Sequence, residues 1–351
     1  MSGPRSPLTV SVVIITAGRR QCLPPCIESL RRQTYRPMEI VVVVGPSQDG
    51  TAGYASTLTD AKVCHVDRLN VSYARNEGVR QSGGDIIAFI DDDAVAHPRW
   101  LEEVVGVFER EGPTCGGVGG VVINENAPAR PIQALNNTIN DLGEPTEFRL
   151  APAGFNDPAG PEFNYFMGAN MAFRREAILA AGGCDEVYTY HFEDADLSLA
   201  VIQAGYRIVH HTRALVHHYP AVSHNRRSWF DLNYFAIARH QLYFALKFSR
   251  RPTRSCFWSV ARTKTAWLRL YVNLMRQFQI TPWAALRYTV MAVRGLADGL
   301  KHGRQHRTHG RVPVLTPDLP RPEFRPLEPA AVPAAPPAPA ARRHRLRVAL
   351  I

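Results

Sequence analysis

Long apolar runs and paired cysteines are both missing from this sequence. No stretch of about 18 uncharged apolar residues occurs, so a membrane-spanning helix is not expected. The first residues, MSGPRSPLTV, lack the apolar core of a secretory signal, which predicts a cytoplasmic protein. The six cysteines form no CxxC pair, and this spacing argues against a structural zinc site and for reduced thiols.

Acidic side chains are nearly absent from one part of the chain. Residues 226–311 hold 17 Lys and Arg against only Asp231 and Asp298, whereas residues 1–225 hold 18 basic and 26 acidic side chains. The whole chain of 351 residues is 45% hydrophobic and has a net charge of +10. This composition is sufficient for a sizeable core and excludes a wholly disordered chain. The uneven charge predicts two regions with different tasks.

The first 120 residues alternate between strand-like and helix-like segments. Apolar runs predict strands at Val10–Ile15, Glu39–Val44, Lys62–Val66 and Asp85–Ile90, and helical patterns lie at Cys22–Gln33 and Tyr73–Gln81. Such alternation predicts an α/β fold, in which a mostly parallel sheet carries helices on both faces.

The remaining sequence differs from this pattern. Residues 124–162 are rich in Pro, Asn and Gly, and we expect loops and short elements around a binding cleft. The domains drawn from the sequence are a catalytic domain at 1–225, a basic, aromatic helical extension at 226–311 and a disordered tail at 312–351. Pro and Ala dominate that tail, which ends in RRHRLRVALI.

Three consecutive aspartates, Asp91 to Asp93, directly follow the apolar strand at 85–90. Ligands in open α/β sheets bind beyond the carboxyl ends of the strands, so these acids are expected to face a cleft. Carboxylates suit Mg²⁺ or Mn²⁺, and a cation among them would relieve their mutual repulsion. The triplet fits equally well an acidic turn that caps the helix beginning near His97.

A second acidic run, Glu193, Asp194 and Asp196, opens a helix that ends near Gly205. One or two acids are common in a first helical turn because they cap free N–H groups and offset the helix dipole. Three exceed what capping requires, and a carboxylate here can accept a proton from a hydroxyl. The helix end lowers and the neighbouring acids raise the pKa of such a carboxylate, so its net shift does not follow from the sequence.

Histidines gather near the end of the proposed catalytic domain, at positions 210, 211, 217 and 218. His217 follows the apolar pair Leu215 and Val216, where a strand would end near the cleft. Histidine is a frequent metal ligand, but four of them also fit a polar strand edge, which the residues alone favour. Arg75 could clamp a phosphate with its guanidinium or be an ordinary surface arginine.

Taken in order, these motifs resemble the family 2 glycosyltransferases, an inverting group with the GT-A fold. The resemblance covers about residues 8–220 and runs through SVVIITAGRR, EIVVVV with its SQDGT turn, YARNEGVRQSGGDIIAFIDDDAVAHPRWL, FMGANMAFRREAI and FEDADLSLAVIQAGYRIVH. It implies a GT-A-like domain that binds a nucleotide-diphosphate sugar and, with Mn²⁺ or Mg²⁺, transfers one hexose-like sugar to an acceptor hydroxyl. The implied acceptor is a glycan or a lipid-linked molecule.

The resemblance also implies roles for individual residues. Asp91 and Asp93 match the motif that holds the metal, and Asp194 matches the aspartate that deprotonates the acceptor. His217 falls where several members carry a histidine that completes the metal shell. The residues assigned to donor binding are Thr16, Arg19, Ser47, Asp49, Arg75, Asn76, Asp91, Asp92, Gly168, Asn170 and Glu193.

The sequence departs from the family pattern at two places. Val44 stands where many members carry the aspartate that contacts the base, and Asp49 could replace that aspartate only if its loop bends back. The donor base therefore stays open. The Q-x-x-R-W signature of processive synthases is absent, since the nearest string, residues 225–229, reads NRRSW. A polymer-extruding synthase is not expected.

Two other functions fit parts of the sequence. A nucleotidyltransferase would want a glycine-rich basic loop after the first strand, where residues 16–20 supply one glycine. A nucleic-acid-binding protein would explain the basic residues of 226–311, but no nucleic-acid motif is recognisable and no nucleic-acid partner is expected. We instead predict that the basic, aromatic segments Ser228–Phe248 and Phe257–Met275 attach the protein peripherally to an anionic membrane surface, on the inner face of the cell membrane. Packing of these helices on the catalytic domain is the alternative.

Overall fold

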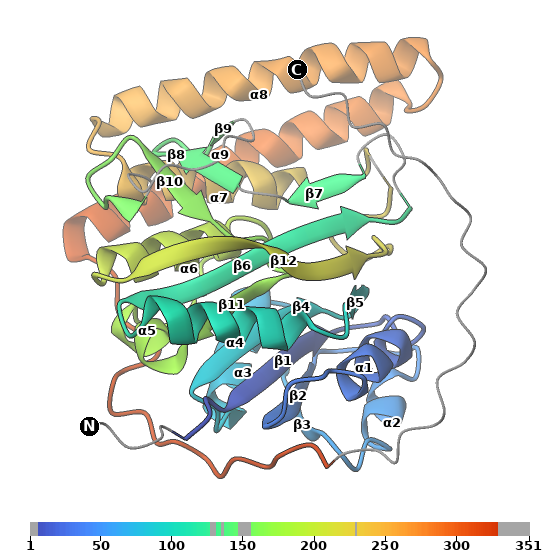
Figure 1. Ribbon diagram of the computed structural model, residues 1–351. Coiled ribbons are helices and arrows are strands. Elements are labelled where there is room, and N and C mark those ends of the chain that lie inside the picture. The colour runs from blue at the N-terminus through green and yellow to red at the C-terminus, as the bar shows by residue number, and fades with distance from the viewer. Residues whose placement is uncertain (1–5, 127–130, 135–136, 147–155, 229, 329–351) are drawn as a thin grey trace, which may run out of the picture.

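One large mixed sheet forms the centre of the molecule (Figure 1). The computed structural model describes residues 6–126, 131–134, 137–146, 156–228 and 230–328. In this part of the chain the sheet consists of β1 (Val10–Thr16), β2 (Met38–Val44), β3 (Lys62–His65), β4 (Ile86–Asp91), β5 (Ala94–Ala96), β6 (Cys115–Asn124), β7 (Ile132–Ala134), β11 (Met171–Arg174) and β12 (Arg207–His218). Their spatial order is β3-β2-β1-β4-β11-β6-β12-β5, with β7 paired to β6.

The strand directions confirm the predicted α/β class. The strands β3, β2, β1 and β4 are parallel, and β6 pairs in parallel with β12. The strands β11, β5 and β7 are antiparallel to their neighbours, so the sheet is mixed in its second half. All four strands predicted from apolar runs are present, with boundaries shifted by one residue.

Helices cover both faces of the sheet, as expected. They are α1 (Leu23–Arg31), α2 (Thr51–Ala55), α3 (Val71–Gln81), α4 (Trp100–Glu111), α5 (Arg175–Ala180) and α6 (Glu193–Gln203). Alternate residues of β1 face two different hydrophobic clusters: Val12 and Ile14 pack with α1 and α4, whereas Val13 packs with α3, α5 and α6. Burial on both faces explains why the parallel strands read as continuous apolar runs.

A small three-stranded sheet stands in the region predicted to form loops and short elements. It consists of β8 (Asn137–Asn140), β9 (Pro145–Thr146) and β10 (Glu162–Tyr165), in the order β10-β8-β9. Its Ile139 and Phe163 are buried in the cluster that also contains α6. Residues 127–130, 135–136 and 147–155 of the same predicted region lie outside the described residues.

The helical extension is present as α7 (Tyr234–Phe248), α8 (Thr253–Arg276) and α9 (Pro282–His309). The first of these is part of the core rather than a surface helix, because Tyr243 and Phe244 are buried in the same cluster as α6. The prediction that Ser228–Phe248 faces a membrane is therefore wrong for α7, which packs on the catalytic domain. In the described part of the chain, no helix combines the length and the hydropathy needed to cross a membrane.

After α9 the chain continues as an extended segment, residues 312–328, which Figure 1 shows in red-orange. This segment runs along the end of the molecule opposite α8 and α9. Leu315 and Leu327 are buried in the two clusters on opposite faces of the sheet. The Leu327 N–H donates to the Met38 carbonyl, and Arg321 pairs with Asp85 at 2.7 Å. The expected disorder from Val312 onward is therefore corrected for residues 312–328, because apolar anchors and backbone hydrogen bonds hold them. Residues 329–351, including RRHRLRVALI, lie outside the described part.

Candidate active site

The acidic triplet lies where the carboxyl ends of the parallel strands meet. In the register of the sheet, Ile15 pairs with Asp91 and Thr16 pairs with Val44, so the last residues of β1, β2 and β4 lie at one edge. Asp91 ends β4, and Asp92 and Asp93 form the turn before β5. This placement is the one expected from the position of the triplet after an apolar strand.

The structure gathers two of these carboxylates and one imidazole into a group that could hold a metal ion. One ligand atom each of Asp91, Asp93 and His218 lies within 4.8 Å of the others, and His218 Nε2 is 3.2 Å from Asp93 Oδ1. Two carboxylates and a neutral imidazole are a donor set that suits Mn²⁺ or Mg²⁺. The residues present therefore fit the divalent cation that the sequence led us to expect.

His218, and not the expected His217, occupies the place beside the triplet. Both end β12, where successive side chains point to opposite faces of the sheet. His218 is buried, whereas His217 is about one third exposed and its Nδ1 lies 2.6 Å from Glu125 Oε1. The alternation was visible in the sequence, but the two adjacent histidines left its phase undetermined.

Thr16, at the end of β1, and Arg19, in the loop after it, both reach the triplet. The Arg19 guanidinium pairs with Asp92 at 2.6 Å and with Asp93 at 2.7 Å, and Thr16 Oγ1 donates to Asp92 Oδ2 at 2.6 Å. Burial raises the pKa of Asp92 to about 7 in spite of Arg19, and Asp93 adds to this rise. Burial also acts to raise the pKa of Asp93, but the hydrogen bond with His218 and the charge of Arg19 hold it below its usual range.

A second group of charged residues surrounds the start of α6. Asp194 Oδ2 accepts from the Gly168 N–H at 3.0 Å, and Oδ1 accepts from the Ala195 N–H at 2.8 Å. Burial raises the pKa of Asp194 to about 7, and the neighbouring Glu193 contributes to this rise. A half-buried carboxylate with such a pKa exchanges its proton near neutral pH, which is a property of general bases.

Arg75 connects the two groups. Its guanidinium is buried and pairs with Glu193 at 3.1 Å, and the charges of both Asp91 and Asp194 act on it. The pKa of Arg75 is raised because these acids outweigh its burial. Gly168 leaves room for this arginine, since a Cβ at that position would lie 2.3 Å from Arg75 Nη2. Glu193 Oε2 is buried without a hydrogen-bond partner among the described residues, so one acceptor remains available for a ligand hydroxyl.

The backbone immediately before α6 is strained. His191 and Phe192 have φ values of 64° and 71°, a region that residues with a side chain rarely adopt. Phe192 is held there by α7, since its ring packs 5.5 Å from that of Phe244. A strained turn that the surrounding structure enforces is typical of functional sites, and here it presents Glu193 and Asp194. No sequence signal indicated this turn.

Three of four further residues assigned to the donor have other partners in the structure. Asn76 hydrogen-bonds the Cys184 backbone, and Asn170 accepts from Trp100 and donates to two carbonyls of neighbouring strands. Asp49 accepts from the Arg20 and Thr51 N–H groups and so links the loop after β1 to the turn before α2. Ser47 Oγ is buried without a partner among the described residues. Asn76, Asn170 and Asp49 therefore position the framework, because their hydrogen-bonding atoms are already engaged.

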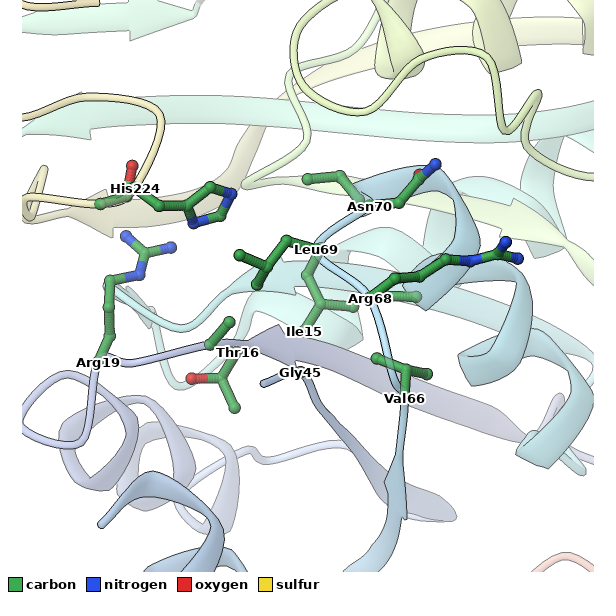
Figure 2. A pocket seen from close by; sticks show the side chains of 13 residues that line it. Ile15, Thr16, Arg19, Gly45, Val66, Arg68, Leu69, Asn70 and His224 are labelled. Carbon is green, nitrogen blue, oxygen red and sulfur yellow. The ribbon is translucent and has the colours of Figure 1, made fainter. Parts of the chain in front are cut away.

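A pocket lies beside Arg19, between the ends of β1 and β2 and the loop before α3 (Figure 2). Apolar side chains and backbone form most of its wall, and Arg68, Asn70 and His224 add polar groups. Ser47 and Asp49 are not among the residues that line it, and neither is Val44. The lining residues are Ile15, Thr16, Ala17, Arg19, Gly45, Val66, Arg68, Leu69, Asn70, Val71, Ala74, Ser223 and His224.

Lys247 supports the candidate site at the first turn of α6 and was not identified from the sequence. It reaches from α7 to pair with Asp185 at 2.8 Å and with Asp196 at 2.6 Å, and all three side chains are buried. Asp196 is therefore half of a buried ion pair two residues from Asp194, rather than only a helix cap. The partner comes from a helix 51 residues further along the chain, so no local pattern could have revealed it.

The fold is an α/β fold of the GT-A type. TarS 1–349 of S. aureus, solved with UDP-GlcNAc, superposes with a TM-score of 0.53 at 12% identity, over 86% of this chain and 92% of that 1–349 chain. GalNAc-T7, solved with UDP, GalNAc and Mn²⁺, superposes with a TM-score of 0.51 at 17% identity, over 71% of this chain and 52% of its own. Both likenesses concern the fold.

Residues 11–180 match the sequence model of glycosyl transferase family 2. The glucosyl-dolichyl phosphate glucuronosyltransferase of Haloferax volcanii is 28% identical over 224 residues, which are 60% of this chain and 69% of that protein. The chain belongs to glycosyl transferase family 2, and the resemblance inferred from the motifs is confirmed. It is a glycosyltransferase.

Proposed function

We propose that the protein is a metal-dependent, inverting, non-processive glycosyltransferase. It would move one hexose-like sugar from a nucleoside diphosphate to a hydroxyl of a glycan or lipid-linked acceptor. The observation that carries the proposal is the position of Arg75, whose guanidinium pairs with Glu193 and is acted on by both Asp91 and Asp194. One buried cation thus joins the group that could hold a metal to the carboxylate that could take a proton.

The donor would lie across the carboxyl ends of β1, β2 and β4. Asp91, Asp93 and His218 would hold Mn²⁺ or Mg²⁺, which supplies positive charge for the diphosphate that leaves. The pocket beside Arg19 would take the nucleoside, and its apolar wall suits a base better than a phosphate. GalNAc-T7, which shares the fold, was solved with UDP, GalNAc and Mn²⁺.

Asp194 would act as the general base. Its two carboxylate oxygens accept from the N–H groups of Gly168 and Ala195, which fixes the orientation of the carboxylate. The acceptor oxygen forms a bond to the anomeric carbon while the bond to the diphosphate oxygen breaks and the diphosphate keeps the electron pair. The acceptor proton passes to Asp194, and attack from the face opposite the diphosphate inverts the anomeric configuration.

Glu193 and Arg75 would position this base and the sugar. The unpartnered Oε2 of Glu193 is available to accept a hydrogen bond from a sugar hydroxyl, while Oε1 is held by Arg75. A lipid-linked acceptor is supported by the relative from Haloferax volcanii, whose name describes action on a glucosyl-dolichyl phosphate. The chain spans 69% of that relative's length, and the acceptor is part of the proposal.

The test compares Asp194→Asn with Asp196→Asn. Because Asp194 would act only on the acceptor proton, its variant should keep donor affinity while turnover falls by roughly 10²-fold or more. Wild-type turnover should rise with pH up to about 7 and then level, because only the ionised carboxylate accepts a proton. Asp196→Asn should instead lower thermal stability, since it removes a partner of Lys247. Equal turnover in wild type and Asp194→Asn, or full turnover in excess EDTA, would refute the assigned roles.

A further inference from the structure

The helices α8 and α9 each bury one face against the rest of the protein, so the opposite face of each helix points outward. In α9, Ala285, Tyr288 and Ala292 are buried, and glycines continue this stripe at 295, 299 and 303. A Cβ at Gly295 would lie 2.3 Å from the Phe235 carbonyl oxygen of α7, so α9 packs there at close range. The opposite face of α9 therefore has no partner within the described part of the chain.

That outward face is apolar rather than polar. Phe278, in the turn between α8 and α9, is 96% exposed, and Trp283 is 75% exposed. Leu286, Val290 and Val293 follow at helical spacing and are each about half exposed. We call Phe278, Trp283, Leu286, Val290 and Val293 the outer stripe. Single exposed apolar residues are ordinary, but a continuous row marks a surface that another body covers.

Arginines accompany the outer stripe, and most of them have no ion-pair partner among the described residues. Arg287 and Arg294 follow Trp283 and Val290 by four residues and so lie next to them on the helix surface. Arg276 ends α8, and the outward face of α8 adds Arg262 and Arg269. Of these five, only Arg287 has an ion-pair partner among the described residues, which is Asp231 at 3.0 Å. The other acid of the extension, Asp298, is engaged with Arg239.

The outer stripe lies next to the candidate active site. Arg287 and Met291 each follow a stripe residue directly, and both line a second cavity together with His224. His224 also lines the pocket beside Arg19. A surface covering the stripe would therefore lie close to the opening of the site, at the end of the molecule where Figure 1 shows α8 and α9.

We propose that the outer stripe and its arginines dock the protein on an anionic lipid surface, such as the inner face of the cell membrane. The apolar side chains would enter the boundary between headgroups and acyl chains, as in helices that lie in a membrane interface. The arginines would remain at the level of the headgroups, where each basic side chain contributes about 1 kcal/mol, or about fivefold in binding. An anionic surface fits because the exposed charges here are of one sign.

Docking in this orientation would deliver a lipid-linked acceptor to the site. This part rests on the proposed function, because it needs an acceptor that presents its hydroxyl at the lipid surface. The docking itself does not depend on catalysis. Vesicle binding and sugar transfer to a soluble acceptor are therefore measured separately, so either can fail without the other.

The first experiment tests the outer stripe with the full chain. Co-sedimentation uses vesicles of phosphatidylcholine alone and of phosphatidylcholine mixed with phosphatidylglycerol. We expect binding to the mixed vesicles at low salt, and a loss of about tenfold or more in Trp283→Ser with Val293→Ser. The matched control, Ile132→Ser with Val312→Ser, removes two exposed apolar side chains elsewhere and should bind as wild type does.

The second experiment tests the arginines by comparing two double variants that change the net charge of the protein by the same amount. Arg269→Glu with Arg276→Glu should weaken binding to the mixed vesicles by about tenfold or more. Arg32→Glu with Arg110→Glu reverses two exposed arginines, one directly after α1 and one in α4, which are 66% and 58% exposed, and should have little effect. An equal loss in both pairs would show that net charge alone acts, which would overturn the assigned surface.

Three results would overturn the docking proposal. The first is no binding to the mixed vesicles at low salt, and the second is equal binding to neutral and anionic vesicles. The third is a concentration-dependent dimer in solution that Trp283→Ser dissociates, since a second copy would then cover the stripe. Transfer to a soluble acceptor that persists in all of these cases would leave the proposed function standing.

Discussion

Replacing Lys247 with methionine should strongly destabilise the protein. Its ammonium pairs with Asp185 and Asp196 at 2.8 and 2.6 Å, and the three side chains are 5%, 8% and 0% exposed. Methionine keeps most of the volume but leaves two buried carboxylates without a cation. Removing one member of a buried ion pair costs about 3–5 kcal/mol, because the remaining charge is neither solvated nor compensated. This loss corresponds to a fall of about 4–7 °C in the melting temperature for a chain of 351 residues.

The loss should depend on pH. Although burial acts in the opposite direction, Lys247 holds the pKa of Asp185 at about 2, whereas burial raises the pKa of Asp196 in spite of the same lysine. Without Lys247, the pKa values of Asp185 and Asp196 in the folded state rise. The folded variant therefore takes up protons as the pH falls toward the pKa that these carboxyls have in the unfolded chain. The deficit relative to wild type is therefore largest near pH 7 and narrows toward pH 5.

Urea unfolding of wild type and variant at both pH values measures this difference. Lys264→Met is the matched control, because Lys264 is half-buried on α8 and donates to the Gln241 side chain rather than to an acid. It should cost about 1 kcal/mol. Adding Asp185→Asn and Asp196→Asn to Lys247→Met should recover much of the loss, since neutral amides need no cation. A loss in Lys247→Met no larger than in Lys264→Met would refute the reasoning.

Three further predictions concern the metal, the donor and residues 312–328. His218→Ala should weaken Mn²⁺ binding at least tenfold by calorimetry while His217→Ala leaves it unchanged, because only His218 lies beside Asp93; the reverse result would restore His217 as the ligand. Among UDP-, GDP- and dTDP-sugars with Mn²⁺, the true donor at 100 times its dissociation constant should raise the free energy of unfolding by about 2.7 kcal/mol, and no stabilisation by any of them would contradict the donor class. Leu315→Ala and Leu327→Ala should each cost about 2–4 kcal/mol in urea unfolding, as buried leucines do, whereas costs near zero would mean that residues 312–328 are not held.

The parallel half of the sheet was predictable because its physical signal is local. Apolar runs such as Glu39–Val44 are buried on both faces, and the turn residues that follow them end each strand. The acids at the end of β4 and at the start of α6 could be placed for the same reason. Their positions follow from where an element ends.

The errors have a common cause, which is that the deciding partner is distant in sequence. His218 and His217 differ only in the phase of β12, which its pairing with β5 and β6 fixes. Asn76 and Asn170 carry side chains suited to a ligand, yet their partners are backbone and side-chain atoms distant in the sequence. The composition of residues 312–328 indicated disorder, but two leucines and a few backbone hydrogen bonds suffice to hold the segment.

The path of residues 312–328 also bears on when the protein completes its fold during synthesis. The Arg325 N–H donates to the buried Glu39, 286 residues earlier, and Leu327 packs in the cluster of β1 and β2. At about 5–20 residues per second, the ribosome adds the last of these residues about 15–60 s after Glu39. For that interval the N-terminal strands lack part of their cover and Glu39 lacks one of its donors. The first strands to leave the ribosome are therefore among the last to become fully buried.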